Sequence, residues 1–294
     1  MSRPGIWRWV TKGSPFTDVY NGWQRLQTNS RFSVALSRAA ANAALRRVDP
    51  IYPDSWEFSG FSQNGEDGVI DYLCSQLSAA PNRYFLEIGA SNGMENNTSF
   101  LALAKRYCGV MVEGNEKLSR AAAGSYAGLN WGVKFLAKRV GPADAKTLLA
   151  ELATHTPDVF SLDIDGIDYH VAKALFDEGF RPRIAIVEYN SAFGPDRSVT
   201  VEHHAEYNRG RFHKSGLYYG VSVAGWRKFF EQRDYDFVNV DQNGVNAFFI
   251  EREAFPQGFV TRLKRNSFRE NFTQPHRDWR RQFELIRDLP LVEI

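Results

Sequence analysis

The stretch FLEIGASNG (residues 85–93), followed one helix length later by GVMVEG (residues 109–114), decides the fold of this chain. Each half reads as a short apolar strand with an acidic residue at its end, Glu87 in the first and Glu113 in the second. Between them lies a turn of small residues, which lets the backbone come close to a ligand. This pattern is typical of a nucleotide-binding site at the edge of an open parallel sheet.

The spacing of the small residues distinguishes two kinds of nucleotide. A pyrophosphate-binding turn has the pattern G-x-G-x-x-G, but here Gly89 is followed by Gly93, and position 91 is a serine. Glu87 would repel a pyrophosphate, whereas it can accept hydrogen bonds from the ammonium group of a methionine moiety. Glu113 stands where a carboxylate accepts hydrogen bonds from ribose hydroxyls. These residues favour S-adenosylmethionine over a dinucleotide.

Length and composition set the outer limits. With 294 residues, 43% of them hydrophobic, the chain is long enough for one large domain with additions or for two small domains. Residues 1–48 carry eight Lys or Arg and one Asp, net +7, and the rest carries 28 Lys or Arg against 33 Asp or Glu, net −5. Cys74 and Cys108 fall at apolar positions, so we expect buried free thiols and neither a disulfide framework nor a metal cluster.

The sequence has no run of about 18 apolar residues and no apolar core of a secretory signal near its start. We therefore expect a cytoplasmic protein. The basic, Trp-rich segment 1–56 is compatible with two roles. It can contact the inner membrane surface, where a lipid-linked glycan would lie, or it can form a helical layer that covers the core or joins subunits of a homo-oligomer. Nucleic acid is not an expected partner, because no recognition motif accompanies the charge.

Apolar periodicity predicts an alternating series of strands and helices. This alternation implies right-handed crossovers and a parallel sheet covered by helices on both faces. After a further helix over residues 223–233, two strands flank the turn Asn243-Gly244, which predicts a hairpin with an antiparallel last strand. The predicted strands are 84–88, 109–113, 132–136, 159–163, 184–188, 235–240 and 246–251, and the predicted core helices are 66–77, 98–106, 116–125, 144–154 and 169–178.

These elements divide the chain into three parts. Residues 1–56 form a basic N-terminal helical extension, with a helix near residues 30–48. Residues 57–252 form the core. Residues 253–294 form a C-terminal helical extension, because Trp279, Phe283 and Ile286 lie at helical spacing.

Residues 191–220 make an unusually long connection within the core. A segment of this length that is rich in histidine and tyrosine predicts a lid or substrate-binding loop. Tyr207 and Phe212 are expected to contact substrate, whereas Tyr218 and Tyr219 directly precede a helix and are expected to pack.

Six segments, taken in order along the chain, resemble the FkbM-type S-adenosylmethionine-dependent methyltransferases. The resemblance covers about residues 58–251 and leaves residues 1–56 unmatched. It implies a Rossmann-like class I methyltransferase fold with a seven-stranded, mostly parallel sheet. It also implies an O-methyltransferase that acts on a hydroxyl group of a sugar, glycan or natural product. The segments are SQNGEDGVI (62–70), FLEIGASNG (85–93), VMVEGN (110–115), SLDIDGIDYHV (161–171), VEYNSAFGP (187–195) and GVNAFFI (244–250).

The resemblance also implies which residues bind the cofactor. Glu87, Gly89 and Gly93 would line the methionine and the ribose, and Glu113 would hold the ribose diol. The full set of expected cofactor-binding residues is Glu87, Gly89, Ala90, Gly93, Glu113, Gln63 and Asp163.

Methyl transfer to a hydroxyl needs a base or a metal ion to weaken the O–H bond. Asp165 is one catalytic candidate, at a position where many members of the family have Glu. His204 is the other, because imidazole titrates close to working pH. Asp168 lies on the same loop as Asp165, and it can serve either the chemistry or the start of the following helix.

The metal alternative rests on oxygen ligands at the ends of two neighbouring strands. Asp163, Glu188 and Asn190 would suit Mg²⁺ or a similar hard cation. In the resembling metal-dependent O-methyltransferases, acidic residues at these strand ends hold such an ion. Asp163 can instead orient backbone amides of the cofactor loop. Two rival functions remain: transfer to nitrogen or carboxylate, which needs no strong base, and a non-catalytic member of the fold that binds a ligand or partner.

Overall fold

The structure is a computed structural model, and it describes residues 15–153, 155–274 and 277–294, with side chains from residue 30 onward. The first 14 residues of the predicted basic extension therefore lie outside the described residues. The helices are α1 (Pro15–Leu45), α2 (Glu66–Ser75), α3 (Ser99–Ala104), α4 (Glu116–Tyr126), α5 (Ala145–Glu151), α6 (Asp168–Asp177), α7 (Arg209–Phe212), α8 (Val223–Glu231) and α9 (Trp279–Glu284). Short 3₁₀ helices are η2 (Pro53–Trp56), η3 (Pro142–Asp144), η4 (Ser191–Phe193), η5 (Arg252–Ala254) and η6 (Val260–Arg262).

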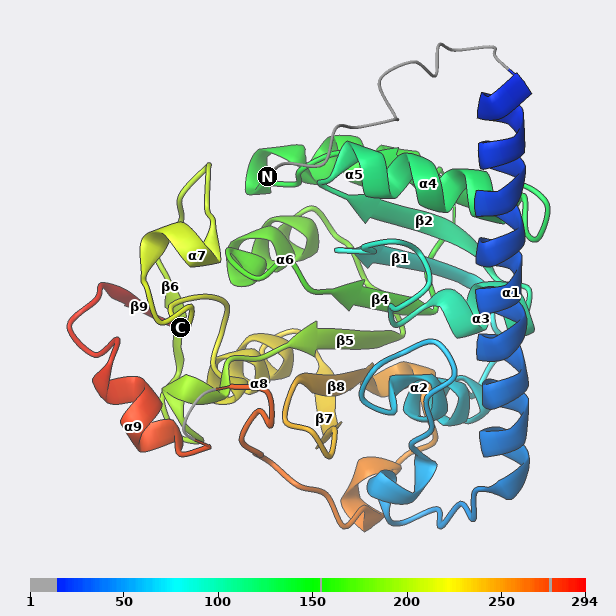
Figure 1. Cartoon of the computed structure of the whole chain (residues 1–294). Coiled ribbons are helices and arrows are strands. Elements are labelled where there is room, and N and C mark those ends of the chain that lie inside the picture. Colours follow the sequence, from blue (N-terminus) through cyan, green and yellow to red (C-terminus); the bar gives the residue numbers. More distant parts are fainter. Residues whose placement is uncertain (1–14, 154, 275–276) are drawn as a thin grey trace.

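Seven strands form one sheet in the order β3-β2-β1-β4-β5-β8-β7 (Figure 1). The first five run parallel, β8 runs antiparallel to β5, and β7 pairs antiparallel with β8. This arrangement confirms the predicted Rossmann-like sheet with an antiparallel last strand. The strands are β1 (Tyr84–Ile88), β2 (Cys108–Glu113), β3 (Val133–Ala137), β4 (Val159–Leu162), β5 (Ile184–Glu188), β7 (Tyr235–Val240) and β8 (Asn246–Glu251).

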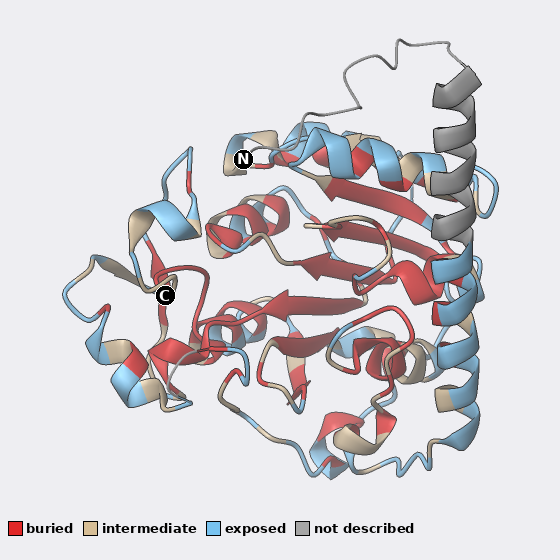
Figure 2. Ribbon diagram, viewed as in Figure 1, coloured by how far each residue is buried: buried red, intermediate tan, exposed pale blue. Residues whose placement is uncertain are grey.

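The sheet buries both faces, as Figure 2 shows by the red strands at the centre of the molecule. Because side chains alternate along a strand, Leu86 and Ile88 of β1 face α5, α6 and α8. Phe85 of the same strand faces α1, α2, α3 and α4 on the other side. The near-continuous apolar runs that predicted these strands follow from this burial on two faces.

The chain order reverses between β1 and β4. From β1 the chain proceeds outward through β2 to β3 and then returns to β4 on the other side of β1. In open parallel sheets such a switch point leaves a crevice at the carboxyl ends of the strands, where ligands bind. The fold therefore places residues 88–91 and 163–167, which follow β1 and β4, at the same edge.

Most of the described part of the N-terminal extension is the long helix α1, which stands along the side of the molecule (Figure 1). Phe32 and Ala39 of α1 are buried in the layer that holds α2 and α3, whereas Val34 is 57% exposed. Helix α1 thus covers part of the core with one face. Its start at Pro15 lies well before the predicted residue 30.

The segment 191–220, predicted as a lid or substrate-binding loop, contains regular secondary structure. It contains η4, strand β6 (Val199–Val201) and helix α7, and β6 pairs antiparallel with β9 (Leu291–Glu293) at the end of the chain. The C-terminal extension is therefore not purely helical, since it supplies a strand as well as α9. These two remote segments stabilise each other through a second, small sheet.

The predicted burial of both cysteines holds for only one of them. Cys108 is exposed at the start of β2, whereas Cys74 is partly buried in α2, and burial raises the pKa of its thiol to about 12. Among the described residues, no helix combines the length and apolar character that a membrane span requires.

Candidate functional site

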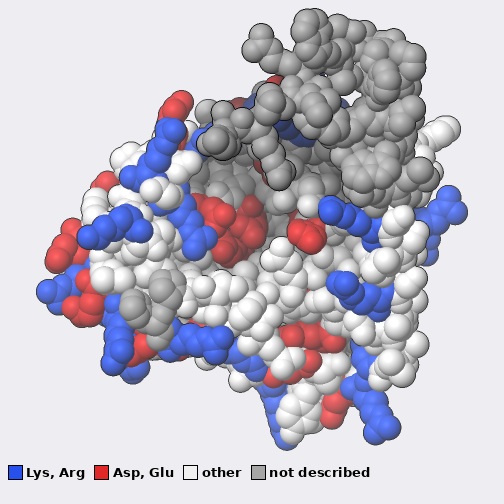
Figure 3. Space-filling model, viewed as in Figure 1, with Lys and Arg blue, Asp and Glu red and all other residues white. Residues whose placement is uncertain are grey.

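A cavity of about 640 Å³ opens at the carboxyl edge of the sheet, beside the switch point. Its volume lies in the range of small-molecule and cofactor sites. Figure 3 shows acidic side chains gathered in a hollow of the face that it displays. The acidic residues that line the cavity outnumber the basic ones: Glu66, Glu87, Glu95, Glu113, Asp163 and Asp165 against Lys138 and Arg139.

The turn after β1 forms one wall of this cavity. The backbone N–H groups of Gly89 and Ala90 both donate to the carbonyl of Val112, which ties the turn to β2. Gly89 has φ +95°, and a Cβ there would lie 1.6 Å from the carbonyl oxygen of Asp163. Only glycine lets the ends of β1 and β4 approach this closely. Gly89 therefore has the position that the sequence predicted, on the cavity wall.

Glu113 ends β2 on the same wall. Its Oε2 accepts a hydrogen bond from Ser91 N at 2.8 Å, and its Oε1 accepts one from Asn115 N at 2.6 Å. These bonds fix the carboxylate between the β1 turn and the start of α4. Each oxygen keeps a second lone pair, so the group can receive two hydroxyl donors from a ligand.

Glu87 corrects one expectation. Its side chain borders the cavity but is only 2% exposed, and both of its oxygens are occupied. Oε1 accepts from Asn97 N at 2.9 Å, and Oε2 accepts from the backbone N and the hydroxyl of Thr98. Burial raises the pKa of Glu87 to about 7. The carboxyl group holds the segment before α3 in place, and a role in gripping a ligand ammonium does not follow from its contacts.

Two other expected cofactor contacts lie away from the cavity wall. The carbonyl of Gly93 accepts from Ser99 Oγ and Tyr126 Oη, and a Cβ at Gly93 would lie 2.9 Å from Ala122. Ala90 is buried, and its carbonyl accepts from Asn96. Both residues stabilise the turn on the side away from the cavity. Gln63, in contrast, is exposed on the cavity wall.

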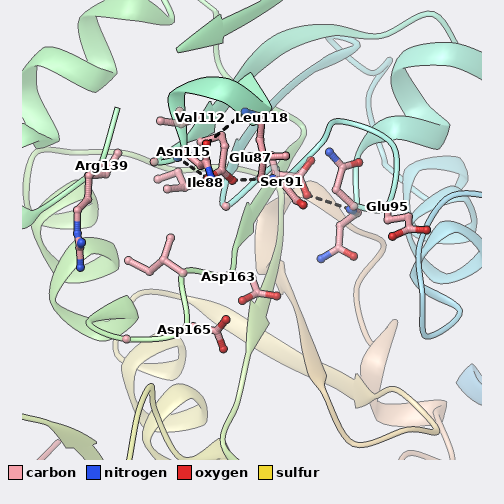
Figure 4. Close-up of a pocket in the computed structure, with 18 of the residues that line it drawn as sticks. Glu87, Ile88, Ser91, Glu95, Val112, Asn115, Leu118, Arg139, Asp163 and Asp165 are labelled. Carbon is pink, nitrogen blue, oxygen red and sulfur yellow. Dashed lines mark hydrogen bonds between the residues drawn. The ribbon is translucent and has the colours of Figure 1, made fainter. Parts of the chain in front are cut away.

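The opposite part of the cavity is acidic. Asp163, Asp165 and Glu188 place carboxylate oxygens within 4.8 Å of one another, and Figure 4 shows Asp163 and Asp165 side by side. Burial, followed by the charges of Asp165 and Asp168, raises the pKa of Asp163 to about 8. Burial and the charge of Asp163 raise the pKa of Glu188 well above its ordinary value. Within the part of the chain that the structure describes, Asp165 is the one of the three that forms an ion pair, with Arg209 Nη1 at 2.6 Å.

The side chain of Asp168 stabilises the loop between β4 and α6. It is 1% exposed, and its two oxygens accept from Ile164 N and Gly166 N, both at 2.9 Å. Burial raises its pKa to about 6. The carboxyl group closes the loop between β4 and α6 and does not line the cavity, so the structure does not bring it together with an acceptor.

Asn190 corrects the expected metal set. It is fully buried, and its Nδ2 donates to the carbonyls of Leu217 and Tyr219 at 2.7 and 2.9 Å. Its Oδ1 accepts from Ala192 N. These bonds hold the segment 217–219 against β5. The donor set Asp163, Glu188 and Asn190 therefore does not fit a divalent ion. The carboxylate of Asp165, and not Asn190, lies close to those of Asp163 and Glu188, but Asp165 already forms an ion pair with Arg209.

His204 lies outside the cavity. Its ring packs 4.7 Å from that of Phe212, and its Nε2 is 4.0 Å from Glu202 on the exposed surface. Tyr207 lines the cavity, but it is only 4% exposed. Its ring stacks on that of Phe212 with the ring centroids 4.5 Å apart, and its hydroxyl donates to the carbonyl of Tyr218. Tyr218 and Tyr219 pack as expected. The aromatic side chains of this segment thus mainly hold it together.

The sequence did not single out three residues that the fold brings to the site. Arg209 reaches Asp165 from α7, and its guanidinium lies 3.9 Å over the ring of Tyr219. Asn246 at the start of β8 and Glu66 at the start of α2 meet on the cavity wall, where Asn246 Nδ2 donates to Glu66 Oε1 at 2.7 Å. A polar residue at the start of a predicted strand was the only local signal for Asn246.

No family model and no curated protein matches the chain. Among solved structures, it is similar to the O-methyltransferase from Bacillus cereus in complex with SAH, at 18% identity over 75% of this chain and 89% of that one, with a TM-score of 0.39. It is also similar to TomG, an O-methyltransferase from Streptomyces achromogenes involved in tomaymycin synthesis, in complex with SAM (17% identity, 72% and 93% covered, TM-score 0.40). A third is the SAH-bound methyltransferase PaMTH1 from Podospora anserina (14% identity, 82% and 97% covered, TM-score 0.43). The assignment of the fold rests on the strand order and register of this chain, not on these likenesses.

Proposed function

We propose that this chain is an S-adenosylmethionine-dependent methyltransferase that acts on a hydroxyl group. One observation carries the proposal: Glu113 faces the cavity beside the close Gly89 turn at the switch point of the sheet. A fixed carboxylate at this place accepts hydrogen bonds from the two hydroxyls of a ribose. Leu118 and Val140 add apolar surface to the same wall, as a purine ring requires.

The charge of the cavity supports this cofactor over other nucleotides. The acidic side chains that line it disfavour a pyrophosphate or a triphosphate, which carry several negative charges. S-adenosylmethionine carries a sulfonium and an ammonium against one carboxylate, so its net charge is positive. The same electrostatic argument favours release of the neutral sulfur product after transfer, because the attraction to the carboxylates is weakened.

The order of the six motifs between residues 58 and 251 supports a finer assignment, membership of the FkbM-type methyltransferases, with a sugar, glycan or natural product as acceptor. Asp163 is then the best-placed base. It lies at the end of β4 on the cavity wall, and its raised pKa of about 8 matches a group that takes up a proton near neutral pH. The bound cofactor supplies the electrophilic methyl group. Asp163 would accept the hydroxyl proton as the acceptor oxygen gains the methyl carbon and the C–S bond breaks.

Calorimetric titration of the full chain with S-adenosylhomocysteine tests the proposal. Glu113→Ala removes the acceptor of the two ribose hydroxyls and should weaken binding roughly 10- to 100-fold. Glu116→Ala is the matched control, since Glu116 is exposed on the next turn, pairs with Arg120 and does not line the cavity. Absence of binding to the wild-type chain, or equal binding by both variants, would refute the proposal.

A further inference from the structure

Residues 202–216, which we call the strap, run beside the cavity between two firmly held ends. At one end, β6 stops at Val201, where it pairs with β9. At the other end, hydrogen bonds from the buried side chain of Asn190 hold residues 217–219. All residues of the strap are described, and only Tyr207 is buried, whereas the rest are exposed or half-buried. The strap therefore has fixed ends and a middle that few contacts hold in place.

Two arginines join the strap to two walls of the cavity. Arg139, in the segment after β3, donates from Nη2 to the carbonyl of Tyr207. Arg209, in the strap itself, donates from Nη1 to the carboxylate of Asp165 at 2.6 Å, on the loop after β4. Arg139, Tyr207 and Asp165 all line the cavity, and Figure 4 shows Arg139 and Asp165 at different places on its wall. The strap thus bridges the segments that follow β3 and β4.

The place of this bridge follows from the order of the strands. Strands β2 and β1 lie between β3 and β4 in the sheet. In sheets of this kind, ligands bind at the carboxyl ends of the strands beside the switch point. A bridge from the segment after β3 to the loop after β4 therefore borders the place proposed for the cofactor.

Tyr207 anchors the middle of the strap. A Cβ at Gly166 would lie 2.7 Å from Cδ1 of Tyr207, so the ring packs directly against the backbone of the loop after β4. The same ring stacks on Phe212 of the strap, and its hydroxyl donates to the carbonyl of Tyr218. Tyr207 is therefore both the buried anchor of the strap and a part of the cavity wall.

The contacts of the two arginines are of a kind that opens without global unfolding. Arg139 is exposed, and the ion pair of Arg209 with Asp165 is partly exposed, so water can replace both sets of bonds. Segments with few buried side chains open at a lower free energy than the core. The strap can therefore detach from both walls while β6 and residues 217–219 stay in place.

We propose that the strap is a lid on the cofactor site and that Arg139 and Arg209 are its two latches. The cofactor enters and leaves while both latches are open. This inference rests on the proposed function, because the site that the lid borders is the one assigned to S-adenosylmethionine. Both arginines are positioning residues, since they hold the lid and take no part in methyl transfer.

The test measures, by surface plasmon resonance, the rates at which S-adenosylhomocysteine binds to and leaves the full chain. Arg209→Gln removes one latch, and Arg209 is not among the residues that line the cavity. Both rates should rise roughly tenfold in parallel, while the dissociation constant changes less than about threefold. Loss of a direct contact would instead raise the dissociation rate alone and weaken the affinity. Arg139→Gln should also raise the association rate, which the loss of a contact on the cavity wall does not.

Arg211→Gln is the matched control, because Arg211 is exposed on the same short helix α7. Its two rates should equal those of the wild-type chain. The latch variants change residues in different segments, so the test does not depend on the folding of either one. Unchanged rates in both latch variants, a rise in dissociation alone, or an equal rise in Arg211→Gln would overturn the inference. Failure of S-adenosylhomocysteine to bind to the wild-type chain would instead refute the proposed function.

Discussion

The two halves of the cavity are built in different ways. The half that we assign to the cofactor comes from one continuous stretch, in which the turn after β1, the end of β2 and the segment after β3 follow one another along the chain. The acceptor half combines Asp163 with Arg209 from α7 and Asn246 from β8. Behind these residues, the buried side chain of Gln274 forms hydrogen bonds with the hydroxyls of Ser191 and Tyr219. The first half therefore depends on local backbone geometry, and the second on contacts between segments remote in sequence.

Gly89→Ala should destabilise the cofactor half and cause the largest loss in the free energy of unfolding. A methyl group 1.6 Å from the carbonyl of Asp163, at φ +95°, cannot be accommodated without separating β1 from β4. We expect a loss of more than about 4 kcal/mol in the free energy of unfolding, or no folded protein. Urea denaturation measures the change. Gly124→Ala is the control, because nothing lies within 4 Å of a Cβ there, and this change within α4 should stabilise by about 1 kcal/mol.

Asn190→Ala should destabilise the acceptor half, with a loss in the free energy of unfolding that is smaller than that of Gly89→Ala but still large. The change leaves the buried carbonyls of Leu217 and Tyr219 and the N–H of Ala192 without their partner. We expect a loss of about 2–3 kcal/mol, with faster hydrogen exchange over residues 213–222 than over β1 and β2. Asn82→Ala, at an exposed position, should cost under about 1 kcal/mol. Uniform acceleration of exchange would show that the two halves are not independent.

This difference explains what the sequence could and could not predict. The sequence could predict the strands because burial on both faces requires continuous apolar runs. It could indicate that Gly89 and Glu113 lie together at a cavity, because their placement follows from short-range spacing. Glu87 and Gly93 were assigned to the ligand for the same reason, yet their contacts depend on where α3 begins and on the packing of Tyr126. No local pattern reveals that Arg209 would reach Asp165, a pairing across 44 positions.

The pH dependence of stability tests both halves together, because buried carboxyl groups with raised pKa values lie in each: Glu87 beside the β1 turn, and Asp163 at the end of β4. Burial, with the charges of Asp165 and Asp168, raises the pKa of Asp163 to about 8, and burial with the charge of Glu66 raises that of Asp241 to about 7. A folded pKa above the unfolded value means that the native state binds more protons between about pH 4 and these values. Stability should therefore fall as pH rises through this window, by on the order of 1 kcal/mol per pH unit for each proton.

Thermal unfolding at pH 6, 7 and 8 at constant ionic strength measures this slope. The midpoint should be highest at pH 6, and Asp163→Asn should flatten the dependence, because the amide does not titrate. A midpoint that rises from pH 6 to pH 8 would contradict the raised pKa values of these buried carboxyls. Hydrogen exchange at the same pH values should show the change over residues 241–246 before it appears over residues 109–115.

Of these substitutions, Arg209→Gln should lower the global stability least, and its effect should be confined to the segment around α7. The ion pair with Asp165 is partly exposed, with side-chain exposures of 34% and 56%, so its loss should cost under about 1 kcal/mol. Yet Arg209 also donates from Nε to the carbonyl of Gly216 and covers the ring of Tyr219, so it joins α7 to the cavity wall. Hydrogen exchange over residues 202–216 should therefore accelerate while the thermal midpoint barely changes. Arg211→Gln, an exposed position on the same short helix, should leave exchange unchanged. A large drop in midpoint, or equal exchange in the two variants, would mean that packing and not this cation holds the segment against the acceptor half.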